Sequence, residues 1–243
     1  EITTRLVGSE MCIRDRIKNI MGQLGEYGAA YEVDIGRVHT EISELVKAPL
    51  LTLSGFGKQD VTETGSSRFC PGQQIIMTKW AGAAGAAELA YVNKRSLMKY
   101  FPAVYVDEAV EYLWEKTAGE SLLSIEKEIK TAWDMGAGAF HNVTKNGVFG
   151  ALWEMAEMSH AGLEVNFAAI PVRQESIEIC EQYGVNLYET DSLGSVLIGA
   201  EHGEDLVRRL REEGIPAAII GRVTDGNDRT ICRGEETRFL TPP

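Results

Sequence analysis

Residues 140–150 read FHNVTKNGVFG, and this stretch decides the fold. A strand-like segment, 137–143, runs into a polar turn, and the segment 147–159 follows with apolar side chains on one helical face. Mixed domains are built from strands and helices in such succession. Gly147 and Gly150 allow a ligand or a neighbouring backbone to come close. We therefore predict an α/β (α+β) domain around this stretch.

Strand and helix patterns continue outward from this stretch in both directions. Short apolar runs bounded by glycine, proline or polar residues indicate strands, and apolar residues spaced three or four apart indicate helices. The last two strands form a predicted hairpin around Gly234. We expect strands at 30–35, 49–57, 74–78, 137–143, 163–167, 195–200, 217–223, 230–233 and 236–239, and helices at 17–30, 80–90, 107–114, 122–133, 147–159, 176–183 and 204–213.

The N-terminal part of the chain divides into segments of different character. Residues 10–16, EMCIRDR, resemble a translation of the transposase mosaic-end adapter of sequencing libraries, so we expect 1–16 to be a non-native tail and the chain a metagenomic fragment. An ordinary flexible tail is the alternative. The polar stretch 58–72 contains Gly, Ser and Pro and suits a linker. We expect 17–69 to be the remnant of an N-terminal domain and 70–240 a complete second domain.

Composition excludes several classes of protein. The 243 residues contain 24 Lys and Arg against 36 Asp and Glu, a net charge of −12, which argues against a nucleic-acid partner. No run of 18 apolar residues exists, so no membrane partner is expected. The four cysteines are far apart and form no C-x-x-C pair, which favours reduced thiols and a cytoplasmic protein.

Three segments have residue types that suit a binding site. In 36–41, GRVHTE, the side chains of His39, Thr40 and Glu41 can donate and accept hydrogen bonds around a phosphate or an amide, although a solvated turn also explains them. The segment 77–85 places glycines between a strand and a helix, which suits either an anion site or close helix–strand packing.

The third segment is the opening stretch. Thr144 or Asn146 can cap the helix that follows, and capping is compatible with ligand binding at the same N–H groups. Other candidates are weaker. His160 and His202 have no partners at metal-ligand spacing, and 225–228, DGND, suits a hairpin turn better than a calcium loop.

Four stretches, in order, resemble one family. They are PGQQIIMTKW (71–80), HNVTKNGVFGALWEMAE (141–157), AIPVR (169–173) and AIIGRVT (218–224). Together they are similar to the C-terminal domain of the aminoimidazole-ribonucleotide (AIR) synthase superfamily, in its AIR synthase-related, hydrogenase-maturation-like branch. The segment 36–41 and the following apolar run resemble the end of the family's N-terminal domain.

The resemblance implies an ATP- and Mg²⁺-dependent activity. Members of the superfamily use ATP to activate a carbonyl, amide or thioamide oxygen, or transfer a phosphoryl group to a small acceptor. It also implies a small-molecule substrate, a homodimer for the intact protein, and metal-binding aspartates upstream of residue 17. We therefore expect no metal ligand in this chain and no activity from it alone.

The resemblance also assigns residues to the site. Asn142, Thr144 and Gly147 match the family's D-x-T-x-G-G turn, in which Asn142 replaces the aspartate and Asn146 the first glycine. With His39, Thr40, Glu41 and His141 these form the predicted substrate- or nucleotide-binding set; catalytic residues are not assigned. The two asparagines leave open a non-catalytic, nucleotide- or partner-binding paralogue, and an oligomerising scaffold without a ligand is a third alternative.

Overall fold

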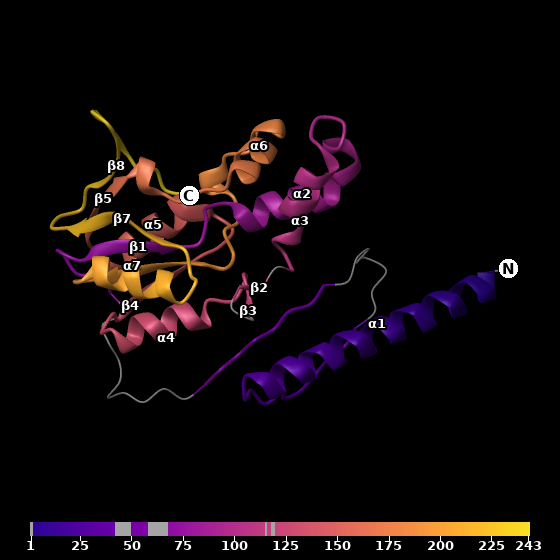
Figure 1. The fold of residues 1–243 in the computed structure, drawn as a ribbon. Coiled ribbons are helices and arrows are strands. Elements are labelled where there is room, and N and C mark those ends of the chain that lie inside the picture. The colour runs from indigo at the N-terminus through magenta and orange to yellow at the C-terminus, as the bar shows by residue number, and fades with distance from the viewer. Residues whose placement is uncertain (1, 42–49, 58–67, 115, 118–119) are drawn as a thin grey trace. The chain divides into compact units, whose positions relative to one another are not determined.

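The structure is a computed structural model that describes residues 2–41, 50–57, 68–114, 116–117 and 120–243 (Figure 1). The chain divides into two compact units, Glu1–Gly57 (unit 1) and Lys58–Pro243 (unit 2). Within the described residues, no helix is both long and apolar enough to cross a bilayer.

Unit 1 contains one long helix, α1 (Ile2–Ala30). The expected helix at 17–30 is confirmed, but it begins much earlier and includes the segment that was expected to be a tail. The expected strand at 30–35 is wrong, and so is the described part, 50–57, of the strand expected at 49–57. A strand is stable only when a neighbouring strand pairs with its backbone, and the described residues of unit 1 include no strand.

Unit 2 is a mixed α/β domain, as the sequence predicts (Figure 1). Its elements are β1 (Gln74–Thr78), α2 (Ala83–Leu97), α3 (Ala103–Glu111), β2 (Lys116–Thr117), β3 (Glu120–Ser121), α4 (Glu126–Asp134), β4 (Ala139–Val143), α5 (Gly147–Ser159), β5 (Gly162–Asn166), α6 (Gln174–Gln182), β6 (Ser195–Ala200), α7 (Gly203–Glu212), β7 (Ala217–Thr224), β8 (Arg229–Arg233) and β9 (Glu236–Phe239), with short 3₁₀ turns at Phe167–Ala169 and Leu187–Glu189.

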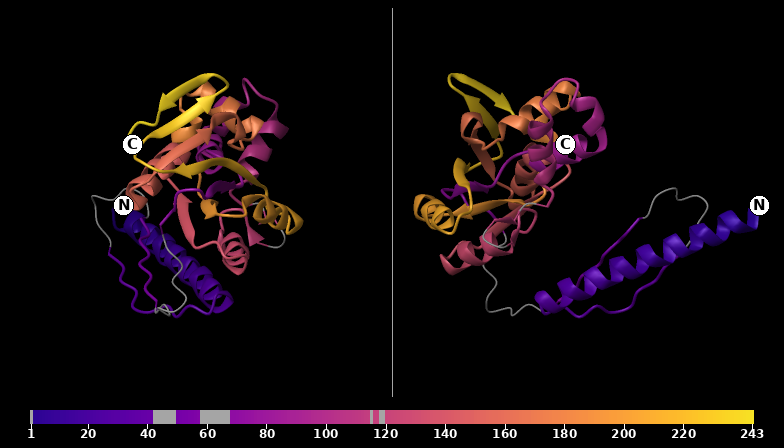
Figure 2. Two further views of the ribbon diagram at one scale, coloured as in Figure 1. Left: turned by 90° about the vertical axis from the view of Figure 1, so that its left-hand side faces the viewer. Right: turned by 45° about the vertical axis from the view of Figure 1, so that its right-hand side comes forward.

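The main sheet has seven strands in the order β4-β6-β1-β7-β5-β8-β9. Strand β1 is the third in this order and pairs antiparallel with β6 and β7 on its two sides. The pair β5–β8 is parallel. The predicted hairpin of the last two strands is confirmed, and it extends from one edge of the sheet in yellow (Figure 2). Strands β1 and β6 are almost wholly buried, which explains why both read as continuous apolar runs.

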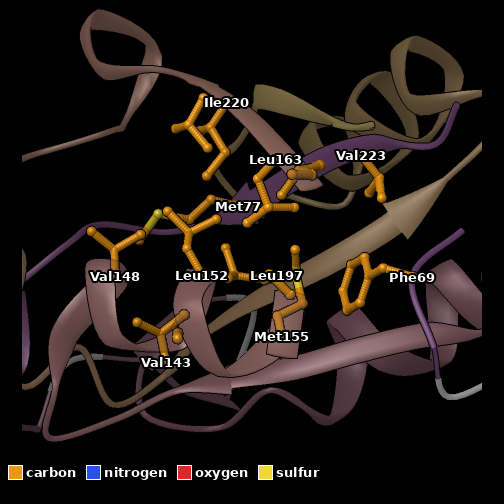
Figure 3. Packing of buried hydrophobic residues seen from close by; sticks show 14 of the residues in the cluster. Phe69, Met77, Val143, Val148, Leu152, Met155, Leu163, Leu197, Ile220 and Val223 are labelled. Atoms are coloured by element: carbon orange, nitrogen blue, oxygen red, sulfur yellow. The ribbon is translucent and has the colours of Figure 1, made fainter. Parts of the chain in front are cut away.

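Helices cover both faces of this sheet. Alternate side chains of a strand point to opposite faces. Met77 of β1 therefore packs with Leu152 of α5 and Leu163 of β5 (Figure 3). Its neighbour Ile76 instead joins a second cluster with Leu210 of α7 and residues of α4. A third group, α2, α3 and α6, forms its own small core beside the sheet.

Several of the predicted elements need correction. The helices expected at 80–90 and 107–114 are observed as α2 and α3 with different bounds, Ala83–Leu97 and Ala103–Glu111. The helix expected at 122–133 begins only at Glu126, because the preceding residues form a loop. The turn 225–228 does not close a hairpin, because β5 lies between β7 and β8 in the sheet. The turn crosses the end of β5 instead, where Leu163 N–H donates to the Asp228 carbonyl at 2.8 Å.

The buried thiol of Cys180 in α6 predicts an alkaline loss of stability. Burial raises the pKa of this thiol from 9.0 to about 11, partly opposed by a hydrogen bond with Thr190. The unfolded chain ionises this group first, so its contribution is complete below pH 9 and disappears as the pH rises towards 11. The free energy of unfolding should therefore fall by at most about 3 kcal/mol across this pH range.

Urea unfolding between pH 8 and 11 measures this effect. The Cys180→Ala variant is expected to show a shallower decline than the wild type. Burial also raises the pKa of Tyr105. Both proteins contain this tyrosine, so its effect on stability cancels in the comparison. Parallel stability curves for the two proteins would contradict the assignment to Cys180.

Candidate functional site

The candidate site lies where β4 ends and α5 begins. The turn between them has the predicted order of strand, polar turn and helix. Gly147 has a φ of 63°, and its N–H donates to the Thr144 carbonyl at 2.8 Å. An added Cβ at Gly147 would lie 2.3 Å from the Tyr188 carbonyl oxygen. The glycine is therefore needed both for its backbone conformation and for close packing.

A hollow of about 360 Å³ opens beside this turn. The end of β4 forms one side of it, the loop before α4 forms a second, and the loop before β6 forms a third. Asn142 and Thr144, two of the predicted residues, both line it. Ser124 adds a third neutral hydrogen-bonding side chain. The full lining is Leu123, Ser124, Ile125, Glu126, Asn142, Val143, Thr144, Leu193, Gly194 and Ser195.

Two further predicted residues meet at a carboxylate that sequence reasoning missed. His141 Nε2 lies 3.1 Å from Glu154 Oε2, and the Asn146 side-chain amide donates to Glu154 Oε1 at 3.3 Å. His141 and Asn142 are adjacent on a strand and so point to opposite faces. Four of the five predicted residues of unit 2 are thus divided between the hollow, with Asn142 and Thr144, and a cluster around Glu154, with His141 and Asn146 (the Glu154 cluster); Gly147 is in neither.

The expected side-chain cap of α5 is wrong. Asn146 occupies the N-cap position, but its side chain makes no capping hydrogen bond. Its amide instead bonds Glu154, two helical turns further along α5. Residues eight apart are beyond the three- and four-residue spacing of neighbours on a helix, so no local sequence pattern predicts this pair.

The comparison with known families identifies this strand-turn-helix domain. A family model described as "AIR synthase related protein, C-terminal domain" matches residues 71–232. The chain belongs to this family. The match includes the hollow, the Glu154 cluster and the four stretches on which the resemblance was based, so the predicted family and fold class are confirmed.

Individual relatives agree with this assignment. The phosphoribosylformylglycinamidine synthase subunit PurL of Methanopyrus kandleri is 27% identical over 114 residues, which are 47% of this chain and 14% of the relative. The selenide, water dikinase of Methanococcus maripaludis is 23% identical over 204 residues, 78% of this chain and 58% of the relative. The chain thus spans less than two thirds of either relative.

Solved structures share the fold. The hydrogenase maturation protein HypE of E. coli has a TM-score of 0.56 at 21% identity, over 74% of this chain and 52% of HypE. A HypE in complex with ATP has a TM-score of 0.55 at 19% identity, over 74% of this chain and 53% of that one. The chain covers about half the length of each.

The AIR synthase-related domain uses the glycines at the start of α2 for packing. Gly82 N–H donates to Ser192 Oγ at 2.7 Å, and Gly85 N–H donates to the Asp191 carbonyl at 2.8 Å. An added Cβ at Gly82 would lie 2.5 Å from the Leu187 carbonyl oxygen. Of the two alternatives for 77–85, the structure therefore supports close packing, because protein groups already satisfy these N–H donors.

A buried ion pair next to the hollow was also not predicted from the sequence. Lys79 Nζ lies 2.6 Å from Glu128 Oε1, and their side chains are 5% and 3% exposed. Lys79 follows β1 with a φ of 53°, a conformation that few non-glycine residues adopt. Its position after an apolar strand gives no sign in the sequence of a partner 49 residues away.

Three of the predicted site residues belong to unit 1. His39, Thr40 and Glu41 are exposed and belong to a segment without helix or strand. Their assignment to the site stays a prediction. Among the described residues, no group of three or more His, Cys, Asp or Glu side chains could hold a metal ion.

Proposed function

We propose that the chain is the C-terminal part of an ATP-dependent enzyme. The reaction would phosphorylate a carbonyl, amide or thioamide oxygen, or transfer a phosphoryl group to a small acceptor. A hydrogenase-maturation-like role is the version we favour, because two HypE proteins share the fold. The observation that carries the proposal is the hollow beside Asn142 and Thr144, within a domain of this family.

The hollow suits a small neutral ligand better than a phosphate group. Its polar lining side chains include the amide of Asn142 and the hydroxyls of Thr144 and Ser124, which can both donate and accept hydrogen bonds. Glu126 adds a negative charge, which disfavours an anion. We therefore place the amide-like or hydroxyl-bearing substrate here.

Nucleotide binding needs other groups. One HypE is described in complex with ATP. In this chain, the N-terminus of α5 can face a phosphate, because the first N–H groups of a helix have no partner within it. The described residues do not by themselves form a Mg²⁺ site, so we derive no metal-dependent step from them. We further propose a homodimer and a cytoplasmic location; the three described cysteine side chains are free thiols.

Steady-state ADP formation by the full-length parent protein tests the proposal. Thr144→Val and Asn142→Ala each remove a hydrogen bond to the substrate, so we expect kcat/KM to fall by about tenfold or more, since about 1.4 kcal/mol corresponds to a factor of ten. Thr237→Val, at an exposed position on β9, is the matched control and should leave kcat/KM unchanged. Equal activity of all variants would contradict a substrate site in the hollow.

The alternative is a non-catalytic paralogue that binds a nucleotide or a partner. The two asparagines that replace family residues, Asn142 and Asn146, favour it. Titration calorimetry with Mg-ATP that shows binding without turnover would support this alternative over the enzyme. In that case Asn142→Asp, which restores the family carboxylate, becomes the variant in which to look for recovered turnover.

A further inference from the structure

We propose that Lys79 is a positioning residue for the hollow, because its ammonium group bonds two of the hollow's walls to the end of β1, an interior strand of the sheet. The importance of the hollow for a substrate rests on the proposed function. The fastening itself rests only on the contacts of Lys79.

The ammonium group of Lys79 is surrounded by acceptors. It donates to the carbonyl oxygens of Leu122 at 2.9 Å, Ser124 at 2.5 Å and Gly194 at 3.1 Å. The Glu128 carboxylate lies 2.6 Å away. Three protons thus face four acceptors, and the side chain is almost completely buried. Three of the four acceptors are backbone carbonyls of loops, so the contacts fix the course of the backbone.

Those loops are two of the hollow's walls. Ser124 lies in the loop before α4, and Gly194 lies in the loop before β6; both residues line the hollow. The loops also touch each other, since a Cβ added at Gly194 would lie 2.2 Å from the Leu122 carbonyl oxygen. Lys79 therefore bonds both loops at a place where they touch, the carbonyls of Leu122 and Gly194.

The backbone of Lys79 is held in place by the sheet. Lys79 directly follows β1, which pairs on both sides within the seven-stranded sheet. Its backbone N–H donates to the Pro216 carbonyl at 2.7 Å. The left-handed backbone conformation at Lys79 redirects the chain at the end of the strand. Asn142 and Thr144 form the facing wall, so their distance from the other two walls depends on this lysine.

A double substitution separates positioning from stability. Replacing a buried ion pair by apolar residues of similar size is often neutral for stability. In Lys79→Met/Glu128→Leu we therefore expect the cost of an unpaired carboxylate to disappear, while the carbonyls of Leu122, Ser124 and Gly194 stay without their donor and the loops are no longer bonded to Lys79. Hydrogen exchange of the full chain measures this through two amides that close the turns at these loops, here called the loop amides. They are Ser124 (to the Ser121 carbonyl) and Ser195, the first residue of β6 (to the Ser192 carbonyl).

The expected result is that exchange at both loop amides accelerates at least tenfold more than exchange in β1. Lys94→Met is the matched control, because Lys94 pairs with Asp107 on the surface of the same unit and should leave both loop amides unaffected. Wild-type exchange at both amides of the double variant would overturn the proposal. No nucleotide is needed, so this failure is distinct from an absence of ATP turnover.

The wild-type protein provides a second measurement if the double variant does not fold. The fastened amides of Ser124 and Ser195 should exchange as slowly as those of β1. The amide of Gln73, bonded to the Cys70 carbonyl in a turn, gives the rate of a loop without such fastening. Loop amides that exchange as fast as Gln73 would overturn the proposal.

Discussion

Lys79→Met alone is expected to lower the free energy of unfolding of unit 2 by roughly 3–5 kcal/mol, the range observed when one partner of a buried ion pair is removed. The substitution leaves the Glu128 carboxylate buried without its cation. It also leaves the carbonyls of Leu122, Ser124 and Gly194 without their donor. Each buried polar group that loses its partner adds to the cost.

Urea unfolding at neutral pH measures this loss. Lys79→Met/Glu128→Leu should recover the part that comes from the unpaired carboxylate, but not the part that comes from the three carbonyls without a donor. Lys94→Met removes a half-exposed pair with Asp107 and should change stability by less than about 1 kcal/mol. If Lys79→Met lowers the free energy of unfolding as little as Lys94→Met does, then removing Lys79 does not leave a costly unpaired carboxylate, and the prediction is wrong.

The elements predicted best are those whose sequence alone determines both burial and boundaries. Strands β1 and β6 are short apolar runs buried in the middle of the sheet, and α5 is bounded by Gly147 and by the end of its apolar face. All three agree with the structure to the residue. The failed strand at 50–57 has equally apolar residues, but Leu50, Leu53 and Phe56 are exposed. An apolar run becomes a strand only when another strand pairs with it.

The lining of the hollow was predictable only where its residues are close in sequence. Asn142 and Thr144 could be grouped because a strand end and the following turn lie together in space whatever the rest of the chain does. Their role in binding comes from the family resemblance and stays a prediction. The contact of His141 with Glu154 depends on how α5 packs across β4. The pair of Lys79 with Glu128 depends on the packing of α4 below the loops, which no local pattern encodes.

Gly147→Ala is the second substitution with a large expected effect. Gly147 has a φ of 63°, and a left-handed conformation costs an L-residue about 1–2 kcal/mol. The new Cβ would also lie 2.3 Å from the Tyr188 carbonyl oxygen and 2.7 Å from Glu189 Cα, and both are backbone atoms that cannot rotate away. Overpacking adds about 1–3 kcal/mol, so we expect a total loss of roughly 3 kcal/mol in urea unfolding.

Gly184→Ala separates the two causes, because Gly184 has nearly the same φ, 64°, with open space where its Cβ would lie. It should lose only the conformational part, about 1–2 kcal/mol. The difference between the two variants then measures the contact of Gly147 with the turn at Leu187–Glu189. Equal losses would mean that this turn moves aside at little cost. If α5 moves instead, it displaces Thr144, whose carbonyl accepts from Gly147 N–H, and the hollow changes shape.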